Sequence, residues 1–279
     1  GVNVIDKFSF TVDGNATDVG DLTVTRYGVA GQSSTTHGYT SGGSDGALKN
    51  VIDKFTFAAD ADATDVGDLT VSRYGPVGQS SETHGYASGG LPAPSSHTTT
   101  IDKFTFAADA NATDVGDLTV ARGWAAPQSS ETHGYTSGGN AGPHNVIDKF
   151  TFASDANATD VGDLTVARFA PAGQSSTTHG YTSGGYNGGT NNIIDKYTFA
   201  SDANATDVGD IITTVYHQTG QSSTTHGYTS AAVTSNTNVI DKFAFASNVT
   251  GTDVGDLTVG RAGPAGQSST THGYTSGAD

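Results

Sequence analysis

The sequence contains no cysteine and no methionine, and the helix formers Glu, Lys and Gln are scarce among its 279 residues. The absence of cysteine excludes disulfides, thiolate metal ligands and a cysteine nucleophile. Because methionine is missing even at position 1, we expect a fragment or a processed product. The 38 glycines, together with many Ser and Thr residues, favour strands and tight turns over helices.

Positive charge is also scarce. Twelve Lys and Arg residues stand against 28 Asp and Glu residues, which leaves a formal net charge of −16. Such a charge repels phosphate backbones and anionic lipid surfaces, so nucleic acid is not an expected partner. No apolar stretch approaches the ~20 residues needed to span a bilayer, so membrane insertion is not expected either.

One unit of sequence is written six times. The tripeptide Ile-Asp-Lys begins at steps of 46 to 49 residues, at Ile5, Ile52, Ile101, Ile147, Ile194 and Ile240. The octet THGYTSGG at residues 36–43 recurs in near-identical form in every unit. Units of this length fit the four-stranded blades of a β-propeller.

Within the first unit, alternating apolar residues predict a strand at residues 4–10, and residues 13–20, rich in Asp, Asn and Gly, predict a turn. Further strands are expected at residues 22–26, 29–34 and 37–41. The chain begins and ends inside a blade-like pattern, which favours a closed ring over a stacked solenoid with capping units. The prediction is an all-β, single six-bladed propeller over residues 1–279, closed by N- and C-terminal strands that share one blade. Its repeat units lie near 1–47, 48–96, 97–142, 143–189, 190–235 and 236–279.

The order of motifs within a unit is an Arg after an apolar segment, a strand of small residues, HGYTSGG and then VIDKFTF. This order resembles the Kelch motif, with its Arg and its aromatic residue before a double glycine, although the Kelch Trp is absent from its usual place. The near-identical repeats are also similar to repeat segments of marine bacteriophage structural proteins. The resemblance implies a propeller and a virion or extracellular surface location.

The Asp- and Asn-rich segment predicted as a turn in each unit could hold a cation. Asp109, Asn111, Thr113 and Asp117 stand at offsets 1, 3, 5 and 9, which resembles the calcium loops of FG-GAP propellers. Thr in place of an acidic ligand, Asp at offset 6 and the lack of a following Glu all weaken calcium binding. We prefer the interpretation that these side chains cap backbone N–H groups in a turn, and keep calcium as the alternative. No other cofactor is expected.

A second repeated set combines an acid, an Arg and a His. Its members in the first two units are Asp6, Arg26, His37, Asp53, Arg73 and His84. A Ser-His-Asp triad would need a nucleophile elbow, which is not written in the sequence, and one asymmetric site rather than six copies. The set is therefore predicted to be a buried polar network, and no catalytic residue is expected.

Differences among the six units fall into two places, the segment after the glycine pair and the segment after the Arg. If strand direction alternates, both connections emerge on one face of the disc. The ring-bearing residues that we select there as a candidate binding surface are Tyr27, Tyr74, Trp124, Phe169, Tyr186, Tyr216 and His217. Such side chains stack on sugar rings or pack against proteins. Neutral drift in exposed loops is the competing explanation.

These patterns predict a non-enzymatic recognition or structural propeller that binds a glycan or a protein through this variable face. It could form part of a larger multidomain or virion assembly. The alternative is a purely architectural repeat domain without a ligand. A glycan-active enzyme is disfavoured because it needs paired carboxylates, and the variable segments carry only Asp45.

Overall fold

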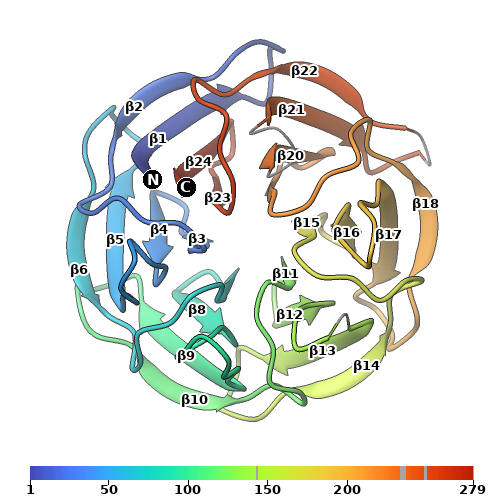
Figure 1. Ribbon diagram of the computed structural model, residues 1–279, viewed down its shortest axis with the longest axis horizontal. Coiled ribbons are helices and arrows are strands. Elements are labelled where there is room, and N and C mark those ends of the chain that lie inside the picture. Colours follow the sequence, from blue (N-terminus) through green and yellow to red (C-terminus); the bar gives the residue numbers. More distant parts are fainter. Residues whose placement is uncertain (143, 233–236, 248–249, 279) are drawn as a thin grey trace.

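The computed structural model describes residues 1–142, 144–232, 237–247 and 250–278. These residues form 24 strands in six four-stranded antiparallel sheets, which are arranged as a ring around a central axis (Figure 1). The predicted all-β, six-bladed propeller is confirmed. Within the described ranges there is no helix long and apolar enough to cross a membrane. Pro143 and residues 233–236, which belong to two variable segments, lie outside the described residues.

Each blade is built in the same order from the axis outward. The innermost strands have the sequence AGQS or a close relative, and they are β3 (Ala30–Ser33), β7 (Val77–Ser80), β11 (Ala126–Ser129), β15 (Ala172–Ser175), β19 (Thr219–Ser222) and β23 (Ala265–Ser268). The second strands are β4 (His37–Ser41), β8 (His84–Ser88), β12 (His133–Ser137), β16 (His179–Ser183), β20 (His226–Ala232) and β24 (His272–Ala278).

The two outer positions follow the same rule. The third strands are β5 (Val51–Thr56), β9 (Thr100–Thr105), β13 (Val146–Thr151), β17 (Ile193–Thr198), β21 (Thr237–Ala244) and β1 (Val2–Ser9). The outermost strands are β6 (Thr64–Asp68), β10 (Thr113–Asp117), β14 (Thr159–Asp163), β18 (Thr206–Asp210), β22 (Thr252–Asp256) and β2 (Thr17–Asp21).

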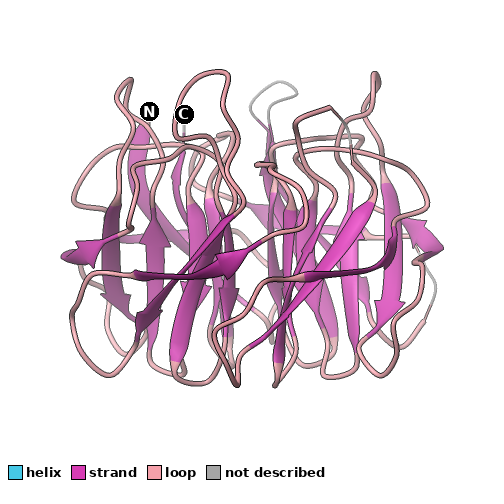
Figure 2. Cartoon of the chain, turned by 90° about the horizontal axis from the view of Figure 1, so that it is seen from below, coloured by secondary structure: helices cyan, strands magenta, loops and turns pink. Residues whose placement is uncertain are grey.

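The ring closes within one sheet. Strand β1 pairs with β24 in the order β2-β1-β24-β23, so the two ends of the chain share a blade, as predicted. We number the other blades 1 to 5 along the chain, starting with β3 to β6. Both ends of the chain lie on the same face of the disc (Figure 2).

The expected outer strand was misplaced. The structure puts it at Thr17–Asp21, inside the segment predicted as a turn, and leaves the residues predicted as a strand, 22–26, in a connection. Apolar Leu22 is buried, but as an anchor after the strand rather than as part of it. An edge strand that faces solvent needs no apolar alternation, so its polar sequence carried no strand signal.

Apolar contacts between neighbouring blades repeat around the disc. Between the closing blade and blade 1, Phe57 stacks on Tyr274 with ring centroids 4.7 Å apart, and Phe55 packs against the same Tyr at 5.5 Å. Equivalent trios of rings stand between the other blades. These contacts bury the faces of every sheet, which leaves solvent access mainly to the edges and loops.

The six innermost strands are joined in a closed circle of hydrogen bonds. The Ser33 backbone N–H donates to Ser80 Oγ of the next blade at 2.9 Å, and the circle ends where the Ser268 N–H donates to Ser33 Oγ at 2.9 Å. The four intervening bonds have the same form. Two positions earlier in the strand the backbones themselves approach, and a Cβ added to Gly31 would lie 2.2 Å from Gly266 O.

This close approach predicts that Gly31→Ala destabilises the protein, because neither backbone can move without displacing its own blade. Overpacking of this kind costs about 1–3 kcal/mol. Gly14→Ala is the matched control, since nothing lies within 4 Å of a Cβ at Gly14. Thermal melts of the two variants measure the difference, and equal midpoints would show that the innermost strands can accommodate a Cβ at Gly31.

Candidate functional site

The topology places both variable connections on one face. The connection from the second to the third strand of a blade and the connection from the outermost strand to the next blade leave the sheet at the same end. The two are joined by backbone hydrogen bonds, as where Tyr27 and Ser44 donate to each other's carbonyls at 3.0 Å. Similar bridges join Tyr74 to Leu91, Gly123 to Asn140 and Phe169 to Tyr186. We call this the variable face; it is also the face of the two termini (Figure 2).

The mouth of the central channel on this face is a second closed circle. Six residues, one from each inter-blade connection, all have positive φ between 51° and 65°. The backbone N–H of each donates to the carbonyl of the one before it, at 2.7 to 3.0 Å. We call them the mouth ring: Gly28, Gly75, Trp124, Ala170, His217 and Gly263. We did not predict this circle; the one sign of it in the sequence is the glycine two places after the Arg in three repeats.

Two members of the mouth ring carry large side chains in a conformation that glycine prefers. Trp124 has φ 51° and His217 has φ 60°. A bulky L-residue in this region costs about 1–3 kcal/mol. Their rings are in contact, with centroids 4.1 Å apart. The chain therefore accepts backbone strain at two positions and thereby places an indole and an imidazole over the channel mouth.

All seven residues predicted on the variable face belong to one continuous row of ring contacts. Successive centroids are 5.2 Å apart for Tyr27 and Tyr74, 4.7 Å for Tyr74 and Trp124, 4.1 Å for Trp124 and His217, 5.1 Å for His217 and Tyr216, 5.2 Å for Tyr216 and Tyr186, and 5.4 Å for Tyr186 and Phe169. Each of the seven is half-buried. We call this set the aromatic row. Residues from five inter-blade connections and one blade loop thus form a single surface.

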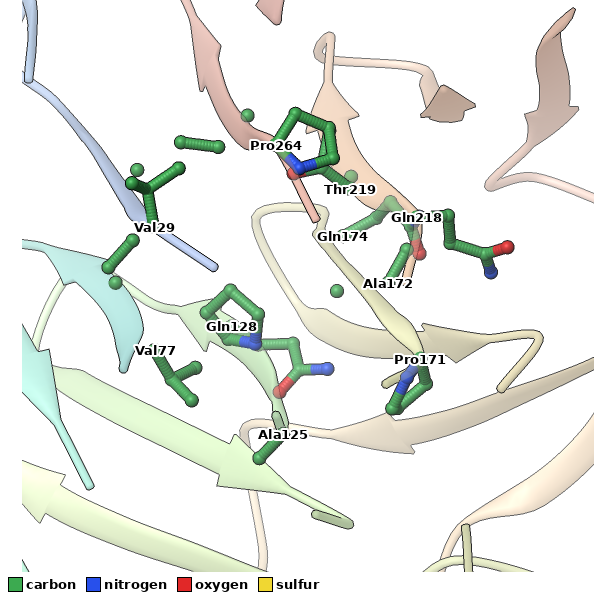
Figure 3. A pocket seen from close by; sticks show the side chains of 18 of the residues that line it. Val29, Val77, Ala125, Gln128, Pro171, Ala172, Gln174, Gln218, Thr219 and Pro264 are labelled. Carbon is green, nitrogen blue, oxygen red and sulfur yellow. The ribbon is translucent and has the colours of Figure 1, made fainter. Parts of the chain in front are cut away.

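A cavity of about 160 Å³ lies in the channel and is lined by Trp124 and His217. Its wall is made by the starts of the innermost strands (Figure 3), where Val29, Val77, Ala125, Pro171 and Pro264 surround the opening. The serines of the inner circle also line it. At the opposite end of the channel, a wider opening of about 380 Å³ is lined by Ser and Thr side chains and Glu82.

The electrostatics of the variable face are close to neutral. Burial lowers the pKa of His217 to about 4, so its imidazole is uncharged at neutral pH. Asp45 and Lys49 are the only charged side chains in the variable segments that follow the glycine pairs, and they pair with each other at 2.8 Å. The Asp residues that give the chain its charge lie mainly in the turns and outer strands elsewhere.

The acid and Arg of the repeated set form buried ion pairs, but between successive repeats. Arg26 contacts Asp53 at 3.1 Å rather than Asp6, which pairs with Arg261 at 2.7 Å. Arg73 pairs in the same way with Asp102 at 3.0 Å. The side chains of all these pairs are fully buried. Each Asp also accepts two hydrogen bonds from a Thr of the connection leading into its blade, such as Thr23 to Asp53.

The His of the set is not part of this network. His37 lies at the other end of β4, where its Nδ1 is 2.8 Å from Thr36 Oγ1, and His84 has the same relation to Thr83. Burial lowers the pKa of His37, and Lys54 lowers it further. The predicted grouping of Asp, Arg and His is therefore wrong for the His. Asp53 lies opposite Thr40 of β4, and His37 is three positions from Thr40 along that strand, at a different level of the blade.

Blade 5 lacks the Arg and leaves its acid unpaired. Val215 takes the place of the Arg, and Asp241 is only 1% exposed. Thr213 Oγ1 donates to Asp241 Oδ2 at 3.0 Å, while Oδ1 has no hydrogen-bond partner. Burial raises the pKa of Asp241 to about 6. Blade 5 is consequently the one place among the described residues where a buried carboxylate meets no guanidinium.

The four residues considered as calcium ligands have different surroundings. Asp109 accepts from Lys54 Nζ at 2.5 Å, and Asn111 Oδ1 accepts from the Asp68 backbone N–H at 3.1 Å. Thr113 begins strand β10, and Asp117 Oδ1 accepts from Thr99 Oγ1 at 2.6 Å. Within the described part of the chain, no three His, Asp or Glu residues gather as metal ligands. The segment instead connects each blade to its neighbour.

Comparison with known proteins adds no family. No protein-family model matches the chain, and no curated protein matches it either. The Kelch-like and bacteriophage relationships therefore stay predictions, and only the geometry of the variable face indicates a function.

The orphaned acid predicts opposite effects for one substitution in two blades. Burial raises the pKa of Asp241 from 3.8 to about 6 in the folded state. Protonated Asp241 therefore contributes to the stability of the fold fully below pH 3.8, and this contribution is lost as the pH rises through 6. That shift corresponds to roughly 3 kcal/mol. Asp241→Asn should therefore stabilise the protein at pH 8, by up to about 3 kcal/mol, and by about half as much at pH 5.

Asp53→Asn is the matched control, since it strands Arg26 and should destabilise the protein by about 3–5 kcal/mol. Urea unfolding at the two pH values measures both variants. Loss of stability in Asp241→Asn at pH 8 would contradict the account of the unpaired carboxylate.

The contact between Trp124 and His217 predicts a spectroscopic titration. Trp124 is the only Trp in the chain, so its fluorescence reports on the channel mouth. An imidazolium quenches an adjacent indole, and the emission should fall with a midpoint near pH 4 as His217 is protonated. The transition should vanish in His217→Gly and persist in His84→Ala. A transition that survives in His217→Gly would place the quenching group elsewhere.

Proposed function

We propose that this protein is a non-enzymatic recognition module that binds a glycan or a protein through the variable face. The observation that carries the proposal is the aromatic row. Seven ring-bearing residues, chosen from the segments where the repeats differ, form one contiguous surface at the channel mouth. Amphipathic rings with a half-exposed face are typical of binding surfaces.

The rigid ring beneath supports this interpretation. The blades are held by inner circles of hydrogen bonds and by buried ion pairs, so loops on one face can change without altering the scaffold. Catalysis is not favoured, because glycoside hydrolysis needs two carboxyl groups at one site. In the variable segments Asp45 is held by Lys49.

An architectural role is the second candidate, and one observation favours it. The members of the aromatic row contact one another, so the row also fills the channel mouth and adds packing there. In that case the face has no ligand and the propeller serves as a spacer in a larger assembly. The virion or surface location proposed for either role is based on the sequence resemblance.

Binding that depends on the aromatic row would separate the two roles. The immobilised protein is screened on a glycan array and in pull-downs from extracts, next to the double variant Trp124→Ala/Tyr216→Ala. We expect retained ligands to be lost in the double variant, because two central rings of the row are removed, and to remain in Val12→Ala, which alters an exposed residue of the opposite face. Equal binding by the double variant would refute the assignment to this face.

A further inference from the structure

The mouth ring is built around one indole. Three of its members are glycine, and a Cβ on any of them would crowd Trp124: 2.8 Å from Nε1 at Gly75, 3.0 Å from Cη2 at Gly28 and 3.2 Å from Cη2 at Gly263. The indole therefore extends from its own blade across to the far side of the ring. Larger residues at these three positions would displace it.

The circle of hydrogen bonds does not itself require a Trp or a His. Gly and Ala occupy the other four positions and form the same backbone bonds at the same φ. A residue that served only to close the circle would be glycine, which adopts positive φ without strain. Trp124 and His217 hence bring side chains to the mouth for a reason other than the backbone, as strained residues at binding sites do.

The polar atoms of the two rings remain available. Among the described residues, neither Trp124 Nε1 nor a ring nitrogen of His217 has a hydrogen-bond partner. The two rings contact each other, and the indole also lies against the mouth-ring glycines. The neutral imidazole offers one donor and one acceptor, and the indole offers a donor beside an apolar face. This combination matches a sugar ring, which presents a C–H face and hydroxyls that both donate and accept.

Charge then limits the class of sugar. The Arg residues that pair with Asp are fully buried, and Lys49 is paired with Asp45, so a carboxylate, sulfate or phosphate on a ligand would meet no free cation among the described residues of the variable face. The net charge of −16 adds a general repulsion of anions. A charged protein partner would find no complementary charge on this face, whereas an uncharged saccharide needs none.

We propose that a neutral oligosaccharide binds across the channel mouth, with one sugar residue stacked on Trp124 and hydrogen-bonded to His217, and with its neighbours on Tyr74 and Tyr216. This inference rests on the proposed recognition function and names its ligand class. The tyrosines on either side continue the same surface, so a chain of several residues fits better than a monosaccharide.

The test is a titration with defined hexasaccharides. Neutral probes are the hexamers of β-1,4-glucose, α-1,4-glucose, β-1,4-mannose, β-1,4-xylose and β-1,4-N-acetylglucosamine, and the acidic probe is hexagalacturonate. Trp124 emission follows binding to the native protein, and calorimetry follows it in the variants. We expect at least one neutral probe to change the emission and to bind at least tenfold more weakly to both Trp124→Gly and His217→Gly.

The two variants keep a residue suited to positive φ and should fold, which thermal melts check; Val12→Ala on the opposite face should bind as the native protein does. Preference for the acidic probe, or neutral binding that is unchanged in both variants, would overturn the inference. Failure of every saccharide alongside capture of a protein that requires Trp124 would also overturn it, while the recognition function would stand. If no probe and no protein binds, the saccharide inference and the recognition function are both refuted, and the architectural role remains.

Discussion

The close approach of the six innermost strands is the constraint on which the structure depends. Neighbouring strands come so near that a Cβ at Gly31 would overlap the carbonyl of Gly266, and a serine hydroxyl two positions later in the strand accepts the adjoining backbone N–H. Both relations can be satisfied around a circle only when every blade presents the same short strand. Glycine takes the position of closest approach in five units and Pro127 takes it in blade 3, and the Gln and Ser that follow are present in all six units.

The buried ion pairs add a second constraint that can be relaxed in one blade. The blade 5 acid keeps its bond from Thr213 after the Arg is lost, so part of its solvation is retained. The Arg and the glycine pair also meet sterically. A Cβ at Gly139 would lie 3.0 Å from Arg122 Cδ, and at Gly185 it would lie 3.2 Å from Arg168 Cδ. Glycine at this position therefore leaves room for the Arg side chain in these blades.

The fold could be predicted from the sequence because periodicity and closure are properties of the whole chain. The strand predicted at residues 37–41 is β4 as observed, since its apolar and small residues are bounded by turn signals. The outermost strand Thr17–Asp21 could not be read, because it satisfies its backbone without burying an apolar face. The partner of Arg26 was equally hidden, since six equivalent acids fit the pattern and only the ring topology selects Asp53.

The two faces of the disc differ in how their side chains are used, and this bears on whether the variable residues reflect drift. On the face opposite the mouth ring, turn side chains such as Asp109 and Asn111 bond to neighbouring blades, so they cannot change freely. The connections of the variable face are joined to each other by backbone groups, so the bonds between them do not depend on side-chain identity. Drift alone would fill such positions with residues that suit the backbone. Trp124 and His217 do the opposite, because they occupy strained positions where glycine is sterically preferred, and their rings meet at the centre of the face.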